Sequence, residues 1–448
     1  MNLTISRRQF LEKTGKGLLV TSISPLLFKT MDVNAMNNKY TEDLKIKDYL
    51  DHFGVHEALM REVMSEALSK GGDYCDLYFQ HGILNYIGLE DNDVNRAYTN
   101  IDYGVGIRVL NGEQTGFSFT EDLSPKAMKQ AAQTAANIAD SGKSIDPAVF
   151  SAYTPPNYYP IITPWEKVSI EEKIPFLQKI NDKVFALDDR IIKTNIAFIN
   201  ESGFMLYANS EGKLTFDYQP MGLIYVNCIA EQNGQRENNS FNLAARSGIE
   251  FFTPENIDKL ATEAVSRTVT LFDAVKPDGG EMEVVLAAGS SGILLHEAIG
   301  HGLEADFNRK EISIFSDKMN KPIAKDFVTI VDNGTNQNIR GSINVDDEGN
   351  ETENTVLVEN GKLRSYIHDR LSARHYNVKP TGNGRRQSFR YAPLPRMRNT
   401  YMLNGPHKKD EIIRSVKKGL YAETFTNGQV YIGGGDFTFY VKSGFMIE

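Results

Sequence analysis

The segment Leu294–Asp306 concentrates side chains that can bind a metal ion. It contains two histidines, His296 and His301, whose neutral imidazoles are common zinc ligands. Glu297 follows the first histidine directly, where a carboxylate can take a proton from metal-bound water. The segment therefore predicts a zinc site that serves hydrolytic chemistry.

The spacing of the two histidines sets a condition on the helix that carries them. At about 100° per residue, positions five apart in a regular α-helix lie roughly 140° apart, too far to share one ion easily. A local π turn, which Gly300 would ease, brings these positions nearly into line. A regular helix would instead place Glu297, His301 and Glu304 on one face, as a carboxylate–imidazole–carboxylate set. Histidines on an apolar helix are also often ordinary core or surface residues, so the short pattern alone leaves the question open.

Several segments of the second half extend the pattern beyond the two histidines. Together with His296–Asp306 they resemble the TldD/PmbA metalloprotease family, specifically its catalytic TldD branch, and they follow in the family's order: Ile343–Gly349, Thr381–Ser388, Arg396–Thr400 and Gly434–Phe437. The resemblance implies that His296 and His301 bind zinc and that Glu297 is the general base of a metallopeptidase acting on flexible or unfolded peptides. The alternative is a catalytically impaired peptide-binding or scaffold subunit of a TldD/PmbA-type complex.

The resemblance also implies a third protein ligand. In the family this ligand is a Cys near the C-terminus. It lies beyond the family segment that corresponds to Gly444–Glu448, and the sequence ends at Glu448. We consider three possibilities: a truncated chain, a substitute ligand such as Glu304 or water, and an impaired site. The two cysteines, Cys75 and Cys228, lie far upstream, where they could pair or remain buried thiols.

Composition and charge narrow the class of protein. A length of 448 residues with 41% hydrophobic residues predicts two or three globular domains. The net charge of −9 argues against non-specific binding to nucleic acid, which needs a basic surface. After the N-terminal segment, no run approaches the roughly 18 apolar residues of a membrane span.

Residues 1–35 have the features of a twin-arginine export signal. Arg7 and Arg8 precede an apolar stretch at Gly17–Phe28, and Val33–Ala35 offers small residues for cleavage. We therefore expect export to the periplasm or another extracytoplasmic location. The alternatives are a basic amphipathic N-terminal helix and a cytoplasmic protein.

The pattern of helices and strands predicts an α+β fold. An N-terminal α/β domain at 36–275 contains two helix–strands–helix subdomains, at about 46–145 and 166–275, joined by a proline-rich connector. A β-rich metal-bearing domain follows at 276–448, with a polar loop at Asp306–Asn320 beside the site. Asn111-Gly112 and Asn360-Gly361 predict tight hairpins. The resemblance implies assembly with a PmbA-like partner subunit, with a homodimer as the alternative.

Five arginines stand close together in this acidic chain. They are Arg385, Arg386, Arg390, Arg396 and Arg398. The resemblance implies that they line the substrate cleft or a subunit contact, and the alternative is a solvated loop with some structural ion pairs.

Overall fold

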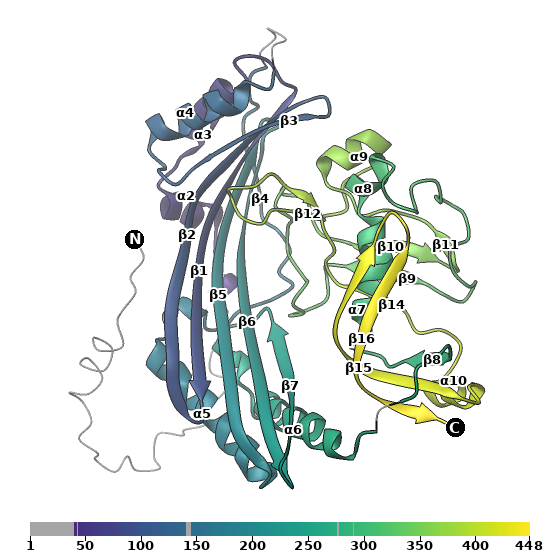
Figure 1. The fold of residues 1–448 in the computed structure, drawn as a ribbon. Helices are drawn as coiled ribbons and strands as arrows, with labels where there is room; N and C mark the ends of the chain where they lie inside the picture. Colours follow the sequence, from purple (N-terminus) through teal and green to yellow (C-terminus); the bar gives the residue numbers. More distant parts are fainter. Residues whose placement is uncertain (1–39, 43, 140–144, 276, 290) are drawn as a thin grey trace, which may run out of the picture.

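A computed structural model describes residues 40–42, 44–139, 145–275, 277–289 and 291–448 (Figure 1). The expected export signal at 1–35 lies outside these residues. The described chain is a mixed α+β protein, as predicted. None of the helices in the described ranges is long and apolar enough to cross a membrane.

One seven-stranded sheet dominates the N-terminal half, with the order β3-β2-β1-β5-β6-β4 and β7 paired to β6. Neighbouring strands are antiparallel, except that β4 runs parallel to β6. The strands are β1 (Tyr74–Glu90), β2 (Asp93–Asn111), β3 (Gln114–Thr120), β4 (Ser151–Tyr153), β5 (Ile191–Asn209), β6 (Lys213–Gln232) and β7 (Gln235–Ala245).

Strand β1 is longer than its sequence indicates. The sequence predicts separate strands at Tyr74–Gln80 and Tyr86–Glu90, but the intervening residues pair with β2 on one side and β5 on the other. Pairing on both sides satisfies the backbone of residues 81–85, where Gly82 and Asn85 weaken the local preference for a strand. The hairpin predicted at Asn111-Gly112 is confirmed, since Asn111 pairs with Gln114 and Gly112 has a φ of 63°.

Two groups of helices cover the sheet at its two ends (Figure 1). One group packs over a core that contains Cys75, and the other over a core that contains Cys228. Both cysteines are buried free thiols, so the possibility of a disulfide between them is not realised. The first group is α2 (Ile46–Phe53), α3 (Glu57–Ala67) and α4 (Pro125–Ala136), and the second is α5 (Ile170–Leu187) and α6 (Pro254–Val269).

Local sequence chemistry begins several of these helices. Ser169 and Glu172 form a reciprocal capping box at the start of α5. Ser124 and Thr253 cap α4 and α6, each followed by a proline at the first helical position. Short 3₁₀ turns complete this half: η2 (Tyr40–Glu42), η3 (Trp165–Lys167), η4 (Ile249–Phe251) and η5 (Thr270–Asp273).

The C-terminal part is built from small sheets. One has the order β11-β10-β9-β14, another β16-β15-β8, and β12 pairs with β13. The predicted hairpin at Asn360-Gly361 joins β10 to β11. The strands are β8 (Glu283–Leu286), β9 (Ile330–Asn333), β10 (Asn354–Glu359), β11 (Lys362–Leu363), β12 (Gly384–Arg385), β13 (Leu394–Pro395), β14 (Thr400–Met402), β15 (Gly419–Tyr431) and β16 (Asp436–Ile447). The helices are α7 (Gly292–Leu295), α8 (Ala305–Arg309), α9 (Arg370–Tyr376) and α10 (Lys409–Ser415).

The C-terminal part lies against the face of the long sheet opposite α2–α4 (Figure 1). Alternate residues of β1 separate the two faces: Cys75 and Leu77 join the helix-covered core, whereas Asp76 contacts the C-terminal part. Asp76 is buried and pairs with both Arg108 and Arg386, and Arg108 also lies 2.7 Å from Glu348. We call this contact area between the two parts the docking surface.

Phe389 adds an apolar contact to the docking surface. Its ring packs so closely over Gly104 that an added Cβ there would lie 2.3 Å from the Phe389 Cε2. A Cβ on Gly106 would likewise lie 2.4 Å from the Phe389 carbonyl oxygen. These two glycines of β2 therefore let the C-terminal part approach the sheet closely.

Candidate metal centre

A π turn at His296–Gly300 follows α7, which is the geometry that two histidines five positions apart need in order to share one ion. The His301 amide donates to the His296 carbonyl, which is the i to i+5 bond that defines such a turn. Gly300 is needed for its small size and not for its backbone conformation. Its φ is an ordinary −57°, but an added Cβ would lie 1.9 Å from the Met397 Sδ. The glycine therefore lets Met397 pack directly against the turn.

The regular-helix alternative is not formed. A 3₁₀ turn covers His301–Leu303, and Glu304 leaves the helix with φ −67° and ψ 122°. After this break Glu304 still contacts the Nδ1 of His301, but it does not join the group of converging ligand atoms. Among the residues that the structure describes, the one group of at least three metal-ligating side chains is His296, Glu297 and His301.

The three side chains converge. One ligand atom from each lies within 4.8 Å of the others, and the two imidazole rings are 4.7 Å apart with their planes at 83°. All three residues are half-buried. Two imidazole nitrogens and a carboxylate oxygen are the donors that zinc accepts, so the residues present fit a metal ion.

The two histidines differ in their electrostatic surroundings. Burial lowers the pKa of His296, and the nearby His301 lowers it further. The pKa of His301 is raised, chiefly by its hydrogen bond to Glu304. Glu304 is fully buried, and one carboxylate oxygen lies 3.2 Å from the His301 Nδ1. Burial raises the pKa of Glu304, although the contacts with His301 and Arg396 oppose this effect.

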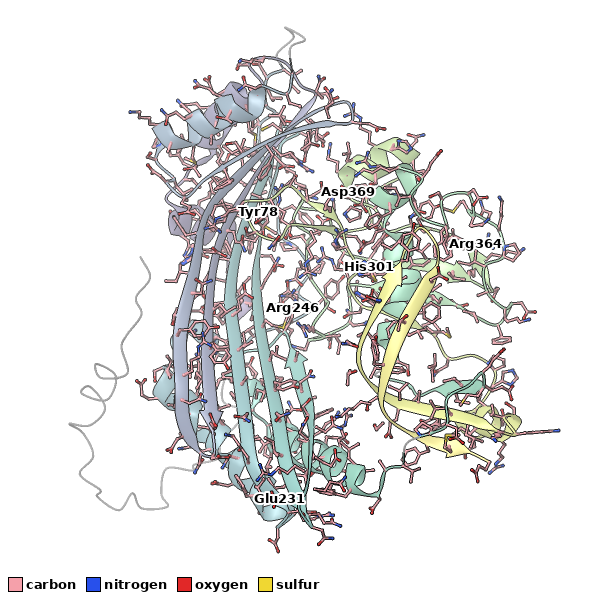
Figure 2. All side chains as sticks on the ribbon, in the orientation of Figure 1. Tyr78, Glu231, Arg246, His301, Arg364 and Asp369 are labelled. Atoms are coloured by element: carbon pink, nitrogen blue, oxygen red, sulfur yellow. The ribbon has the colours of Figure 1, made fainter. Side chains whose placement is uncertain are left out.

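The chain after the turn is anchored by backbone contacts. Leu303 accepts a hydrogen bond from the Ile367 amide, and Ala305 donates to the Ile367 carbonyl. Asn308 and Ser313 donate to the Gly302 carbonyl at 2.8 and 2.6 Å. The C-terminal part therefore holds the chain that follows the π turn. Figure 2 shows His301 between the long sheet and the β15–β16 hairpin, which contacts the π turn.

The polar segment Asp306–Asn320 departs from the predicted loop only at its start, since residues 310–320 form turns and loop outside any helix or strand. Asp306 and Asn308 lie in α8 and are buried, with exposures of 6% and 2%. Their side chains face the protein because α8 packs beside α9 and the Ile367 segment. Polar residues are therefore exposed to solvent only where no other part of the protein packs over them.

The other motif segments contribute to the docking surface. Asp346 accepts a hydrogen bond from the Gly384 amide, and Asp347 accepts one from the Arg386 amide. Arg386 and Arg390 reach carboxylates of the sheet, Arg398 donates to the Gly382 and Gly384 carbonyls, and Arg385 is exposed. The structural ion-pair interpretation therefore describes most of this arginine cluster.

Two residues near the histidines have contacts that the sequence does not predict. Arg396 donates to Glu304 at 3.1 Å, and Met397 packs against Gly300. Both belong to Arg396–Thr400, one of the segments that carry the family resemblance. The resemblance singles out this segment but does not indicate which residues it contacts. Neither cysteine belongs to the metal-ligating group.

Comparison with known proteins covers most of the chain. Residues 75–139, 163–272 and 279–448 match, in that order, domain 1, the central domain and the C-terminal domain of the PmbA/TldA metallopeptidases. The "Metalloprotease TldD homolog" of Haemophilus influenzae is 39% identical over 84% of this chain and 80% of its own length. The "Zinc metalloprotease TldD homolog" of Saccharolobus solfataricus is 28% identical over 87% and 85%.

Solved structures share the fold. A crystal structure from Thermotoga maritima superposes with a TM-score of 0.71 and 20% identity, over 90% of this chain and 88% of that one. TldE from Thermococcus kodakarensis gives a TM-score of 0.69 with 18% identity, over 88% and 87%.

Proposed function

Because this chain belongs to the TldD/PmbA metallopeptidase family, we propose that it is a zinc-dependent peptidase that hydrolyses flexible or unfolded peptides. The observation that carries the proposal is the π turn, which brings ligand atoms of His296, Glu297 and His301 within 4.8 Å of one another. The name of the Saccharolobus relative favours zinc among the metals that these donors fit.

Each of the three residues has a distinct role in this proposal. His296 and His301 hold the ion through ring nitrogens, and Glu297 accepts the proton of the attacking water and later delivers it to the leaving amine. When bound, zinc polarises the scissile carbonyl and makes water a better nucleophile at neutral pH. The three side chains are only half-buried, so solvent reaches them in part, as a site that takes up a substrate needs.

The test separates binding from catalysis. Metal content and cleavage of an unstructured peptide, with and without chelator, are measured on the wild type and on single variants. His296→Ala and His301→Ala should lose the metal. Glu297→Gln should keep it and lose about 10²- to 10⁴-fold in rate, the range for a general base. His407→Ala, which removes an exposed histidine elsewhere, is the matched control and should retain both properties.

A non-catalytic role is the second candidate. The converging group supplies only two imidazoles besides the proposed base, whereas catalytic zinc usually has three protein ligands. If the full-length protein from its host holds no stoichiometric metal and cleaves nothing, a peptide-binding or scaffold subunit becomes the better account.

We further propose assembly with a PmbA-like subunit or a second copy, and export by the twin-arginine route. The first proposal rests on the family resemblance, and a monodisperse monomer at micromolar concentration, with no partner recovered from the host, would contradict it. The second rests on Arg7, Arg8 and Val33–Ala35. Replacing both arginines by lysine should retain the protein in the cytoplasm, and an unchanged location would overturn the proposal.

A further inference from the structure

Glu304 is buried directly behind one of the proposed metal ligands. Its side chain has no exposed surface, and its Oε2 lies 3.2 Å from the Nδ1 of His301. An imidazole whose Nδ1 carries the proton and donates it to a carboxylate has a free lone pair only on Nε2. Glu304 therefore selects the tautomer in which Nε2 of His301 is free to bind a cation.

Arg396 holds Glu304 in this position. Its Nη1 donates to the same Oε2 at 3.1 Å and to the Pro395 carbonyl at 2.7 Å. The Arg396 amide donates to the Asn383 carbonyl at 2.9 Å, which fixes the base of the side chain. The guanidinium thus supplies the positive charge that a buried carboxylate needs, from a segment 92 positions along the chain.

We propose that Arg396 and Glu304 are positioning residues that set the tautomer and ring orientation of His301, and that Glu304 is not itself a metal ligand. The inference rests on the proposed function of His301. Two features argue against ligation by Glu304: its Oε2 already serves two donors, and neither this oxygen nor the unpartnered Oε1 joins the group of converging ligand atoms. Carboxylates that accept from a metal-binding histidine increase metal affinity by raising the basicity of the ring and restricting its rotation.

The first experiment measures zinc affinity on the full-length protein by competition with a chromogenic chelator. Glu304→Gln should weaken zinc binding by about 10- to 100-fold, the usual effect of removing such a partner. The visible spectrum of the cobalt(II)-loaded protein should also shift, because the imidazole is held less firmly. A purely structural role would leave that spectrum unchanged in the folded fraction.

Asp306→Asn is the matched control. Asp306 is a buried acid like Glu304 and lies 3.9 Å from the same Arg396 nitrogen, but the structure gives it no contact with His301. Its change to an amide should leave zinc affinity and the cobalt spectrum close to the wild type. Equal losses in both variants would show that local charge alone matters and would overturn the inference.

Arg396→Gln provides a second route if Glu304→Gln does not fold. The Arg396 side chain is 32% exposed, so its replacement is easier to accommodate, and zinc affinity should fall in the same direction by a smaller factor. Wild-type affinity in the folded Glu304 or Arg396 variant would overturn the inference. Complete loss of zinc in Glu304→Gln, equal to His301→Ala, would show direct ligation instead. A wild type that binds no zinc would count against the proposed function itself, so the two failures remain distinguishable.

Discussion

The docking surface and the metal centre both contain several charged and polar side chains, but the two regions differ in how these side chains are buried and paired. At the docking surface, Asp76, Arg108 and Glu348 are at most 2% exposed, and each carboxylate lies against a guanidinium. At the metal centre, His296 and Glu297 are half-exposed and converge without a cation from the protein between them. Pairing with burial is typical of a structural contact, whereas convergence with partial exposure indicates chemistry.

Buried polar atoms without a hydrogen-bond partner occur in both regions, and Glu348 Oε1 is one of them at the docking surface. Several of them lie beside the metal centre, on the chain that leaves the π turn and on the segment paired to it: Glu304 Oε1, Asp306 Oδ1, Asn308 Oδ1 and His368 Nδ1. Burial lowers the pKa of His368 to about 4, so its ring stays neutral at ordinary pH. Such atoms are costly wherever they are buried, and a run of them along one segment next to the proposed ligands is a feature that functional sites share.

The largest expected effect comes from breaking the buried charge network. Arg108→Met should destabilise the protein by about 3–5 kcal/mol, because Glu348 loses its cation while remaining buried. Urea denaturation followed by circular dichroism measures this change. His301→Ala is the comparison at the open centre and should change the stability of the metal-free protein much less. Similar losses in the two variants would remove the distinction between the regions.

A second prediction concerns the pH dependence of the docking surface. Asp217 is 2% exposed and accepts hydrogen bonds from Tyr159 and Asn344, and burial raises its pKa from 3.8 to about 6. The raised pKa means that the protonated form favours folding. This contribution is fully present below pH 3.8 and is lost as pH rises through about 6.

The lost contribution amounts to about 3 kcal/mol, at 1.36 kcal/mol for each pKa unit. Wild-type stability relative to Asp217→Asn should therefore fall between pH 4 and 7, by up to that amount. Urea denaturation of both proteins across this range measures the difference. A constant difference would mean that Asp217 titrates alike in the folded and unfolded chains.

The sequence predicts what depends on neighbouring residues and misses what depends on distant ones. The π turn is one of two helix geometries that the His296–Glu304 sequence leaves open, and the hairpins follow from their Asn-Gly pairs, because each is a local conformation. The pairing of Arg108 with Glu348 leaves no local pattern, since the partners come from different halves of the chain. For the same reason, Glu304 looks like a candidate ligand until the break in the helix and Arg396 are seen.

A third prediction tests how the π turn is packed. Gly300→Ala places a Cβ 1.9 Å from the Met397 Sδ, and Met397 is too buried, at 8% exposure, to move away freely. The variant should lose about 1–3 kcal/mol of stability through overpacking and should bind zinc more weakly. In a Met397→Ala background the same change should cost little or nothing, because alanine is the better helix former. A double-mutant cycle by urea denaturation gives the coupling, and equal costs in both backgrounds would mean that this contact does not constrain the turn.

The smallest effect is expected at the rim of the docking surface. Arg390 reaches Asp102 and Glu121, both at 2.7 Å, but its side chain is 30% exposed and the two carboxylates are 38% and 63% exposed. Water screens these pairs, so Arg390→Gln should cost about 1 kcal/mol or less, and high salt should reduce that cost further. The ion-pair geometry resembles that at Arg108, and burial is the main difference between the sites. Denaturation of Arg390→Gln and Arg108→Met at low and high salt therefore isolates the effect of burial, and a salt-independent cost of several kcal/mol at Arg390 would show that pairing outweighs exposure.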